Sequence, residues 1–508
     1  MSRAVIVSSD FNPVPSIAKT RAVRVNSAAT TPVEADALGI AVGTSGEPPE
    51  VLSLGRAALS GGGFDGKLGQ TLTIPAAGGP LLVAIGIGDA KGLDAAKVRD
   101  AAAAFARAAG RQARLAILLD GMADVEPQLA AQMCVEGILL ARYSYDPLKR
   151  EPTGVPVESI DIVASPAQLA AAAAGASRGR ILAGATMLAR DLANTPPAHL
   201  TAIRMAEVAA EIAGECGLEV EIFDRDALIS LGCGGLIGVN GGSADEPRMV
   251  RLRYRPSASA VGDSAGPRLA LVAKGIMYDS GGLSLKPADA VHATMKNDMS
   301  GAAAVLAAMS VLGELNCPTV VTGYLMCTDN VPSGTALRLG DVITMRGGTT
   351  VEVINADAEG RLVMADALVL AAEEHPDAIV DIATLTGACL RALGTSMAGV
   401  LGNCQPLVQQ VLDAGAVTGE LAWQLPLQRG YRGELDSDVA DLKNVGGVNA
   451  GTITAALFLA EFTGEVPWAH IDIAGTAQVD SPASWRPMGC SGFGARMLTE
   501  LALNFTSA

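Results

Sequence analysis

The stretch Asn355-Ala356-Asp357-Ala358-Glu359-Gly360-Arg361-Leu362 joins a β-branched run, residues 350–354, to a helical stretch, residues 362–374. A strand, a short turn and a helix in this order are typical of layered α/β architecture. The turn carries two carboxylates and a guanidinium. Because chemistry in open α/β sheets collects at the carboxyl ends of strands, we expect this turn to belong to a functional site.

The same alternation of strand-like and helical segments extends through the chain. Around the turn, further apolar runs cover residues 269–273, 319–326, 378–382 and 469–473, with helical stretches at 301–312 and 452–462. The first part has strand-like runs at 4–7, 39–42, 81–87 and 115–119, with helical stretches at 95–109 and 125–141. Buried strands flanked by helices predict two α/β domains.

We predict a smaller N-terminal α/β domain over residues 1–165 and a larger C-terminal catalytic α/β domain over residues 194–508. The larger domain should have a mixed, mostly parallel central sheet flanked by helices. Between them, residues 166–193 are rich in alanine. Alanine without an excess of Gly, Ser or Pro favours a connecting helix over a flexible linker.

Composition narrows the classes of protein. The chain has 508 residues, of which 49% are apolar, so it can bury large cores and is not disordered. A net charge of −16 opposes binding to nucleic acid or anionic membranes, although a local basic patch stays possible. The eight cysteines are scattered singly, which favours free thiols in a reducing compartment. With no apolar stretch long enough for a membrane span or a secretory signal, we expect a cytoplasmic enzyme.

Two segments upstream of the turn add charged side chains. Lys274-Gly275-Ile276-Met277-Tyr278-Asp279-Ser280-Gly281-Gly282-Leu283-Ser284-Leu285-Lys286 is followed by Met295-Lys296-Asn297-Asp298-Met299. Several carboxylates in one place repel one another unless cations compensate them, so a pair of divalent metal ions is the natural partner. Oxygen-rich ligation suits Mg, Mn or Zn, and the spacing does not choose among them. The chain has four histidines and no HExxH motif, which argues against a histidine-based zinc site.

Together the three segments resemble the active site of the cytosol (leucyl) aminopeptidase family of dinuclear metalloaminopeptidases, and the resemblance runs from residue 191 to residue 475. It implies that the metal ligands are Lys274, Asp279, Asp298, Asp357 and Glu359. It implies that Lys286 is the catalytic electrophile and that Arg361 holds a bicarbonate ion, the general base. It also places the residues Met295, Thr384, Leu385 and Gly387 near the bicarbonate and the substrate.

The resemblance further implies removal of an N-terminal residue, preferably leucine or another apolar one, from peptides during intracellular peptide turnover. Two divalent ions per subunit (Mn, Zn or Mg) and a homohexamer would accompany this activity. The chain departs from the family pattern twice. Ala356 stands where the family usually has Thr, and the interval from Lys286 to Asp298 is one residue longer, with His292 inside it.

Each charged residue also has an ordinary structural explanation. Asp298 could cap the helix that follows it, and Asp357 and Glu359 could be first-turn charges favoured by the helix dipole. Isolated lysines and arginines are usually surface cations. Their joint occurrence at this spacing favours the metal site. Two other functions have less support: nucleic-acid binding, which the net acidity opposes, and phosphoryl transfer, which no P-loop or kinase signature accompanies.

Overall fold

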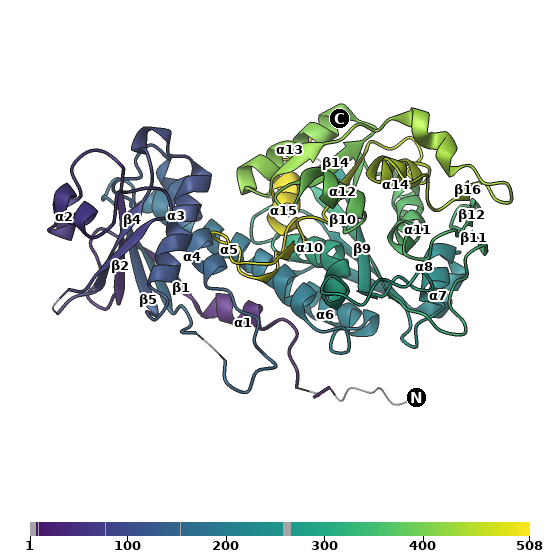
Figure 1. The fold of residues 1–508 in the computed structure, drawn as a ribbon, viewed down its shortest axis with the longest axis horizontal. Helices are drawn as coiled ribbons and strands as arrows, with labels where there is room; N and C mark the ends of the chain where they lie inside the picture. The colour runs from purple at the N-terminus through teal and green to yellow at the C-terminus, as the bar shows by residue number, and fades with distance from the viewer. Residues whose placement is uncertain (1–6, 9, 77, 153, 258–265, 508) are drawn as a thin grey trace. The chain divides into compact units, whose positions relative to one another are not determined.

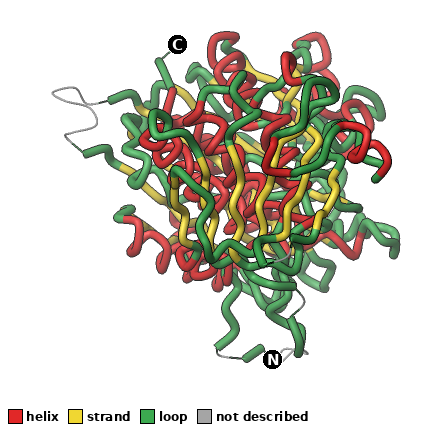
Figure 2. The backbone as a smooth tube through the Cα atoms, turned by 90° about the vertical axis from the view of Figure 1, so that its left-hand side faces the viewer, coloured by secondary structure: helices red, strands yellow, loops and turns green. Residues whose placement is uncertain are grey.

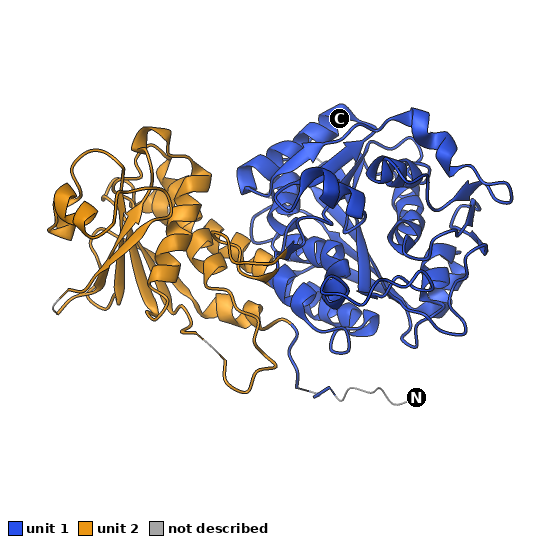
Figure 3. Cartoon of the chain, in the orientation of Figure 1, with its two compact units in different colours: residues 1–13, 188–478, 490–508 blue, residues 14–187, 479–489 orange. Residues whose placement is uncertain are grey.

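The computed structural model describes residues 7–8, 10–76, 78–152, 154–257 and 266–507. By its internal contacts the chain divides into two units (Figure 3). One unit comprises residues 14–187 and 479–489, and the other comprises residues 188–478 and 490–508 with the N-terminal residues up to 13. The boundary falls within helix α5 (Leu169–Asn194).

The N-terminal unit is built on a six-stranded sheet with the order β1-β6-β5-β2-β4-β3, whose strands can be followed in yellow in Figure 2. Every neighbouring pair is parallel except β3 with β4. The strands are β1 (Arg24–Ala28), β2 (Ala37–Val42), β3 (Thr71–Ile74), β4 (Leu81–Gly86), β5 (Arg114–Leu118) and β6 (Ser159–Val163). The helices are α1 (Pro15–Ala22), η1 (Glu50–Leu52), α2 (Arg56–Gly61), η2 (Ala90–Gly92), α3 (Ala95–Ala108) and α4 (Pro127–Ala141).

The starts of α3 and α4 follow from their sequences. The Asp94 side chain accepts a hydrogen bond from the Lys97 N–H at 2.9 Å, and the Glu126 side chain accepts one from the Leu129 N–H at 3.0 Å. Proline at the first position of α4 sacrifices no helical hydrogen bond. Apolar residues of both helices form one core cluster with the inner strands, which stabilises this unit.

The C-terminal unit contains an eight-stranded mixed sheet with the order β15-β14-β17-β13-β9-β10-β8-β7. Its strands β9, β10 and β14 are labelled in Figure 1. The four inner strands, β17, β13, β9 and β10, are mutually parallel, and antiparallel strands flank them. The strands are β7 (Glu219–Phe223), β8 (Arg248–Tyr254), β9 (Arg268–Asp279), β10 (Val320–Asn330), β13 (Ala378–Ala383), β14 (Ala398–Gly402), β15 (Ala422–Gln424) and β17 (Trp468–Asp472). Small sheets add β11 (Val342–Thr344), β12 (Thr350–Glu352), β16 (Leu442–Lys443), β18 (Gln478–Val479) and β19 (Gly489–Cys490).

Helices cover both faces of this sheet (Figure 1). One face carries α6 (Ala202–Cys216), α10 (Ser300–Met309), α13 (Gln405–Thr418) and α15 (Ala495–Asn504). The other carries α8 (Gly234–Asn240), α11 (Glu359–Glu373) and α14 (Gly451–Ala460). The remaining helices of the unit are α7 (Arg225–Ser230), η3 (His292–Met299), α12 (Gly387–Leu393) and η4 (Arg429–Leu435). The predicted two-domain α/β fold with a larger, mixed C-terminal sheet is confirmed.

One predicted strand lies elsewhere than expected. The run 350–354 does not join the central sheet: only Thr350–Glu352 is a strand, β12, and it pairs with β11 and β16. Its alternation of the apolar Val351 and Val353 with polar residues buries one face only, which suits a small peripheral sheet. Residues 4–6 of the predicted run 4–7 lie outside the described residues.

All eight cysteines are free thiols, and six are buried, as the scattered spacing predicted. Within the described ranges, none of the helices combines the length and the apolar composition that crossing a membrane requires.

Candidate metal centre

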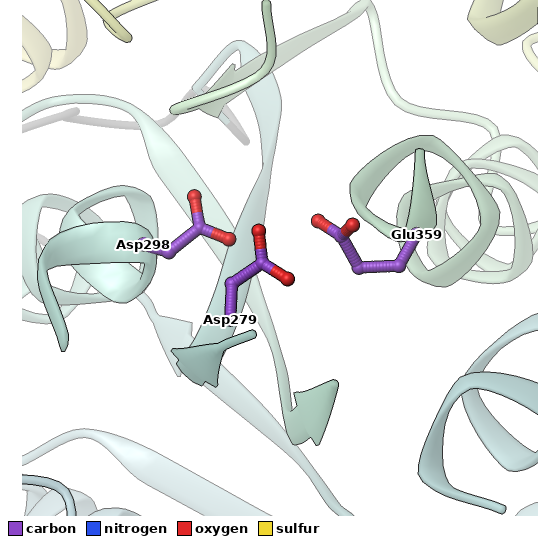
Figure 4. Close-up of side chains that lie close together, drawn as sticks. All are labelled: Asp279, Asp298 and Glu359. Carbon is purple, nitrogen blue, oxygen red and sulfur yellow. The ribbon is translucent and has the colours of Figure 1, made fainter. Parts of the chain in front are cut away.

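Three buried carboxylates converge at the carboxyl end of β9 (Figure 4). Asp279 is the last residue of β9, Asp298 lies in η3 just before α10, and Glu359 is the first residue of α11. Oxygen atoms of the three lie within 4.8 Å of one another. Three segments that are distant in sequence therefore bring like charges to one point of the sheet, where the sequence predicted a site.

Two lysine ammonium groups lie among these carboxylates. The Nζ atom of Lys274 is 2.8 Å from Asp298 Oδ2 and 2.8 Å from Glu359 Oε1, and it donates to the Thr384 carbonyl at 2.9 Å. The Lys286 Nζ atom is 2.7 Å from Asp279 Oδ2 and also pairs with Asp357. The structure thus brings together all six predicted residues, and neither lysine is a surface cation.

Burial controls the protonation of the carboxylates. Burial raises the pKa of Asp298 well above its usual value, and burial together with Glu359 raises the pKa of Asp279. Burial and the charge of Asp279 raise the pKa of Asp357 to about 6. Burial also works against the charge of Glu359, but Lys274 outweighs it and the pKa of Glu359 is lowered. Because two of the three clustered groups resist ionisation, more positive charge would stabilise the site.

For Lys274 the neighbouring charges outweigh the effect of burial on its pKa. Burial opposes the charge of Lys274, but Asp298 and Glu359 outweigh it, so its pKa is raised. An amine binds a metal ion only after it has lost its proton, so an ion at Lys274 would have to displace that proton. Buried oxygen ligands around one amine fit a divalent cation, which would compensate the same carboxylates that the ammonium now compensates.

The ordinary explanation of Asp298 as a helix cap does not hold. The residue at the cap position of α10 is Met299, and no side chain caps that helix. Instead the Thr384 hydroxyl donates to Asp298 Oδ1 at 2.6 Å, which fixes the carboxylate toward Lys274. Thr384 was predicted near the site, and it contacts the cluster through both its hydroxyl and its carbonyl.

Asn330 is a site residue that the sequence did not reveal. Its side-chain amide donates to Asp279 Oδ1 at 2.9 Å, to the Ala356 carbonyl at 2.9 Å and to Glu359 Oε2 at 3.2 Å. A register shift between β9 and β10 at Thr328 places Asn330 directly opposite Asp279. Such bulges re-aim side chains next to functional sites. A single asparagine at a strand end carries no sequence signal, and the predicted strand ended four residues earlier.

Arg361 lies in the first turn of α11 and is buried. Its Nη1 donates to the Asn444 carbonyl at 2.8 Å, and its Nε has no hydrogen-bond partner among the described residues. Burial lowers the pKa of Arg361 to about 10, against the charges of Glu359 and Asp472. A buried guanidinium with donors to spare could hold a small oxyanion. Asn444, which the sequence analysis missed, also donates to the Asn355 carbonyl at 2.7 Å and so fixes the turn.

The other residues predicted near the site lie in the loop after β13, in α12 and in η3. The Leu385 N–H donates to Asp472 at 3.2 Å, and Gly387 is the exposed first residue of α12. Met295 is half-buried in η3. Within the longer interval, the His292 ring stacks on Tyr278 and its Nε2 lies 3.0 Å from the Tyr278 hydroxyl. With this longer interval, Asp298 still lies 2.8 Å from Lys274.

Gly281 forms a tight turn, and its backbone lies close to the Asp357 carboxylate. Its φ of 88° is in the left-handed region, and a β-carbon there would lie 2.8 Å from Asp357 Oδ1. Its N–H donates to Asp279 Oδ1 at 2.8 Å. A side chain at this position would therefore disturb two of the predicted ligands.

Comparison with known proteins agrees with this geometry. Residues 187–499 match the model of the cytosol aminopeptidase family catalytic domain, and residues 53–152 match that of the family's N-terminal domain. A Streptomyces avermitilis protein named "Probable cytosol aminopeptidase" is 41% identical over 95% of this chain and 98% of its own length. Another of that name, from Chlorobaculum tepidum, is 45% identical over 74% of this chain and 75% of its own.

Solved structures agree as well. The bottromycin maturation enzyme BotP is 38% identical, with a TM-score of 0.83 over 92% of this chain and 98% of its own. A structure of BotP in complex with Mn gives the same TM-score at 37% identity, over 92% of this chain and 99% of that one. The chain therefore belongs to the cytosol aminopeptidase family of metal-dependent aminopeptidases.

Proposed function

We propose that the chain is a leucyl aminopeptidase that hydrolyses the peptide bond after an N-terminal leucine or another apolar residue. The observation that carries this proposal is the buried cluster of Asp279, Asp298 and Glu359 with Lys274 between two of its carboxylates. The proposed catalytic domain is residues 194–508, preceded by an N-terminal domain of residues 1–165 and a connecting helix of residues 166–193.

Two divalent ions would occupy this cluster. Lys274, Asp279, Asp298 and Glu359 would hold one, and Asp279, Asp357 and Glu359 would hold the other. Bound there, such ions lower the pKa of a water molecule and polarise a carbonyl group. Mn is the first candidate because a similar structure contains it, while Zn and Mg suit the same oxygen-rich ligands.

Lys286 would act as the electrophile. Asp279 and Asp357 orient its ammonium group at the open side of the cluster, and although burial opposes its charge, these two carboxylates raise its pKa. It therefore stays protonated at neutral pH. A fixed cation at this point would stabilise the negative charge that develops on the scissile carbonyl oxygen.

Arg361 would hold a bicarbonate ion as the general base. Its free donors and its position one helical turn or less from Glu359 support this role. Asn444 keeps the guanidinium in place through its carbonyl. The residues Met295, Thr384, Leu385 and Gly387 would then border the bicarbonate and the substrate backbone.

A double substitution tests the ligand set. Asp279→Ala with Glu359→Ala should abolish hydrolysis of leucyl-p-nitroanilide and retention of Mn after dialysis, because two shared ligands are lost. The matched control is Glu207→Ala with Asp413→Ala, two exposed carboxylates of the same unit, which should leave both readouts unchanged. Hydrolysis by a folded Asp279→Ala, Glu359→Ala protein would refute the proposal.

We also propose a homohexamer that works in the cytoplasm in peptide turnover, as the family resemblance implies. The relatives' name, cytosol aminopeptidase, supports the compartment. Light scattering should give six times the chain mass of 51.5 kDa. The mass of a single chain at working concentration would contradict the assembly.

A further inference from the structure

A second polar pocket lies at the opposite end of the strands that carry the metal centre. It has a volume of about 250 Å³ and is lined by residues of β8, β9, β10 and the end of α11. Arg268 is the first residue of β9, whose last residue is Asp279, and Val320 is the first of β10, whose last is Asn330. At about 3.3 Å per residue, these strand starts are about 35 Å from the metal centre and Tyr324 is about 20 Å from Asn330, so the pocket is a separate site.

Three of the residues that line the pocket are arginines. Arg253, Arg255 and Arg268 contribute three positive charges, and Glu374 is the one carboxylate among the described lining residues. Glu374 is already neutralised, because its two oxygens lie 2.8 Å from Arg251 Nη1 and 2.9 Å from Arg253 Nη2. Among the lining residues alone, positive charges outnumber negative ones, although Glu219 beside the pocket pairs with Arg255 at 2.7 Å.

Most N–H donors of these guanidinium groups make no hydrogen bond to a residue that the structure describes. Arg253 uses Nη2 for Glu374, Arg255 uses Nε for Glu219 at 2.7 Å, and Arg268 uses Nη2 for the Glu374 carbonyl at 2.5 Å. A guanidinium has five N–H donors arranged for bidentate contact with oxyanions. Several donors from β9 and from the end of β8 thus remain available to one ligand.

Tyr324 adds a buried hydroxyl that points to a ligand. The residue is in the middle of β10, lines the pocket and is 1% exposed. Its hydroxyl meets the geometric criteria for a hydrogen bond with none of the described residues, although Glu374 and Arg251 lie near enough to interact with it. A buried polar group without a partner costs free energy, and such groups in native proteins call for an explanation.

We propose that this pocket binds a small dianionic oxyanion, the phosphate group of inorganic phosphate or of a phosphorylated small molecule. Arg253, Arg255 and Arg268 supply the charge, and the Tyr324 hydroxyl supplies a neutral donor at the floor. The lining has three cations and one anion, which matches a dianion better than a single carboxylate. A polynucleotide needs an extended basic stripe rather than an enclosed pocket of this size.

Isothermal titration calorimetry of the full metal-loaded protein with inorganic phosphate, at constant ionic strength, tests the proposal. Tyr324→Phe removes only the hydroxyl, and Arg268→Gln removes one charge. Because a hydrogen bond to a charged group is worth a factor of about ten or more in affinity, each variant should bind phosphate about tenfold more weakly. The control Arg204→Gln removes an equal charge from α6, where Arg204 pairs with Glu207 and Glu211, and should bind like the wild type.

Saturable binding that weakens in Tyr324→Phe and Arg268→Gln alone supports the site. Equal binding in all four proteins would assign the phosphate to the metal centre and overturn the proposal, as would the lack of saturable binding. Acetate that binds as tightly as phosphate would overturn the dianion class. A DNA oligonucleotide that displaces phosphate and loses affinity in the same variants would overturn the small-molecule class.

Discussion

Gly360 lies directly against the side chain of Lys274. A β-carbon on Gly360 would come within 2.7 Å of the lysine Cδ and Cε atoms and 2.8 Å of its Nζ. The first turn of α11 therefore has to present glycine for the lysine to reach Asp298 and Glu359.

Gly360→Ala should displace the Lys274 amine while the helix persists, since alanine favours helices more than glycine does. We expect metal affinity to fall by about tenfold to a hundredfold, as for other changes that misplace ligands. Metal titration followed by activity on leucyl-p-nitroanilide measures this. Gly214→Ala, in α6 with open space around the added carbon, is the control that should keep full activity. Unchanged metal affinity in Gly360→Ala would mean that Lys274 is not a ligand.

Asn330→Ala tests the residue that donates to both Asp279 and Glu359. Its loss removes one donor from each of two buried carboxylates, so we expect about a tenfold to hundredfold loss of metal affinity or activity. The cooperative unfolding transition should remain. Wild-type kinetics with wild-type metal content would show that the amide only packs the strand end.

Lys286→Gln tests the proposed electrophile. Removing one preorganised donor to a developing oxyanion costs about 10²-fold to 10³-fold in kcat, and we expect a loss of that size with bound metal retained. Steady-state kinetics and metal analysis of the same sample separate the two effects. A change confined to KM would instead assign Lys286 to substrate binding.

Asp366 gives a pH dependence of stability that is independent of the metal centre. Its buried carboxylate accepts hydrogen bonds from the N–H groups of Leu236 and Arg346, each at 2.9 Å. Burial raises its pKa to about 7 from the ordinary value of 3.8. The native state therefore binds the proton more tightly than the unfolded state, and Asp366 adds stability as the pH falls from about 7 toward 4.

Asp366→Asn does not titrate, so the wild type should gain stability relative to this variant on going from pH 8 to pH 5. The midpoints of urea unfolding at the two pH values measure this difference. A stability of the wild type relative to Asp366→Asn that stays constant or falls toward pH 5 would contradict the assignment.

The fold was predictable wherever a segment is strongly apolar and long. The runs 269–273 and 378–382 are cores of β9 and β13, because burial on both faces leaves an unmistakable pattern. The strands β1 and β6 were missed, since Asn26, Ser27, Ser159 and Asp161 interrupt their apolar pattern.

The metal ligands and catalytic residues that the sequence predicted are charged side chains that can bind a metal ion or an anion. The site residues that it missed are neutral side chains that only the folded structure brings to the site. Carboxylates and lysines at a family spacing are visible in the sequence. Asn330 is not, because only the shift between β9 and β10 sets it opposite Asp279. Asn444 is likewise brought to Arg361 by tertiary packing from 83 residues away. The arginine pocket arises because β8, β9 and β10 are neighbours in the sheet, an order that the sequence alone does not state.

Metal-dependent removal of N-terminal residues is the activity on which the other predictions for the metal centre depend. Its most direct test is the hydrolysis of leucyl-p-nitroanilide by protein stripped with a chelator and resupplied with Mn, Zn or Mg. We predict no release of the chromophore from the stripped protein and restored release on adding the metal, with loss again in the Asp279→Ala, Glu359→Ala double variant. Full activity of the stripped protein, or no activity with any of the three metals in a folded protein, would contradict the account.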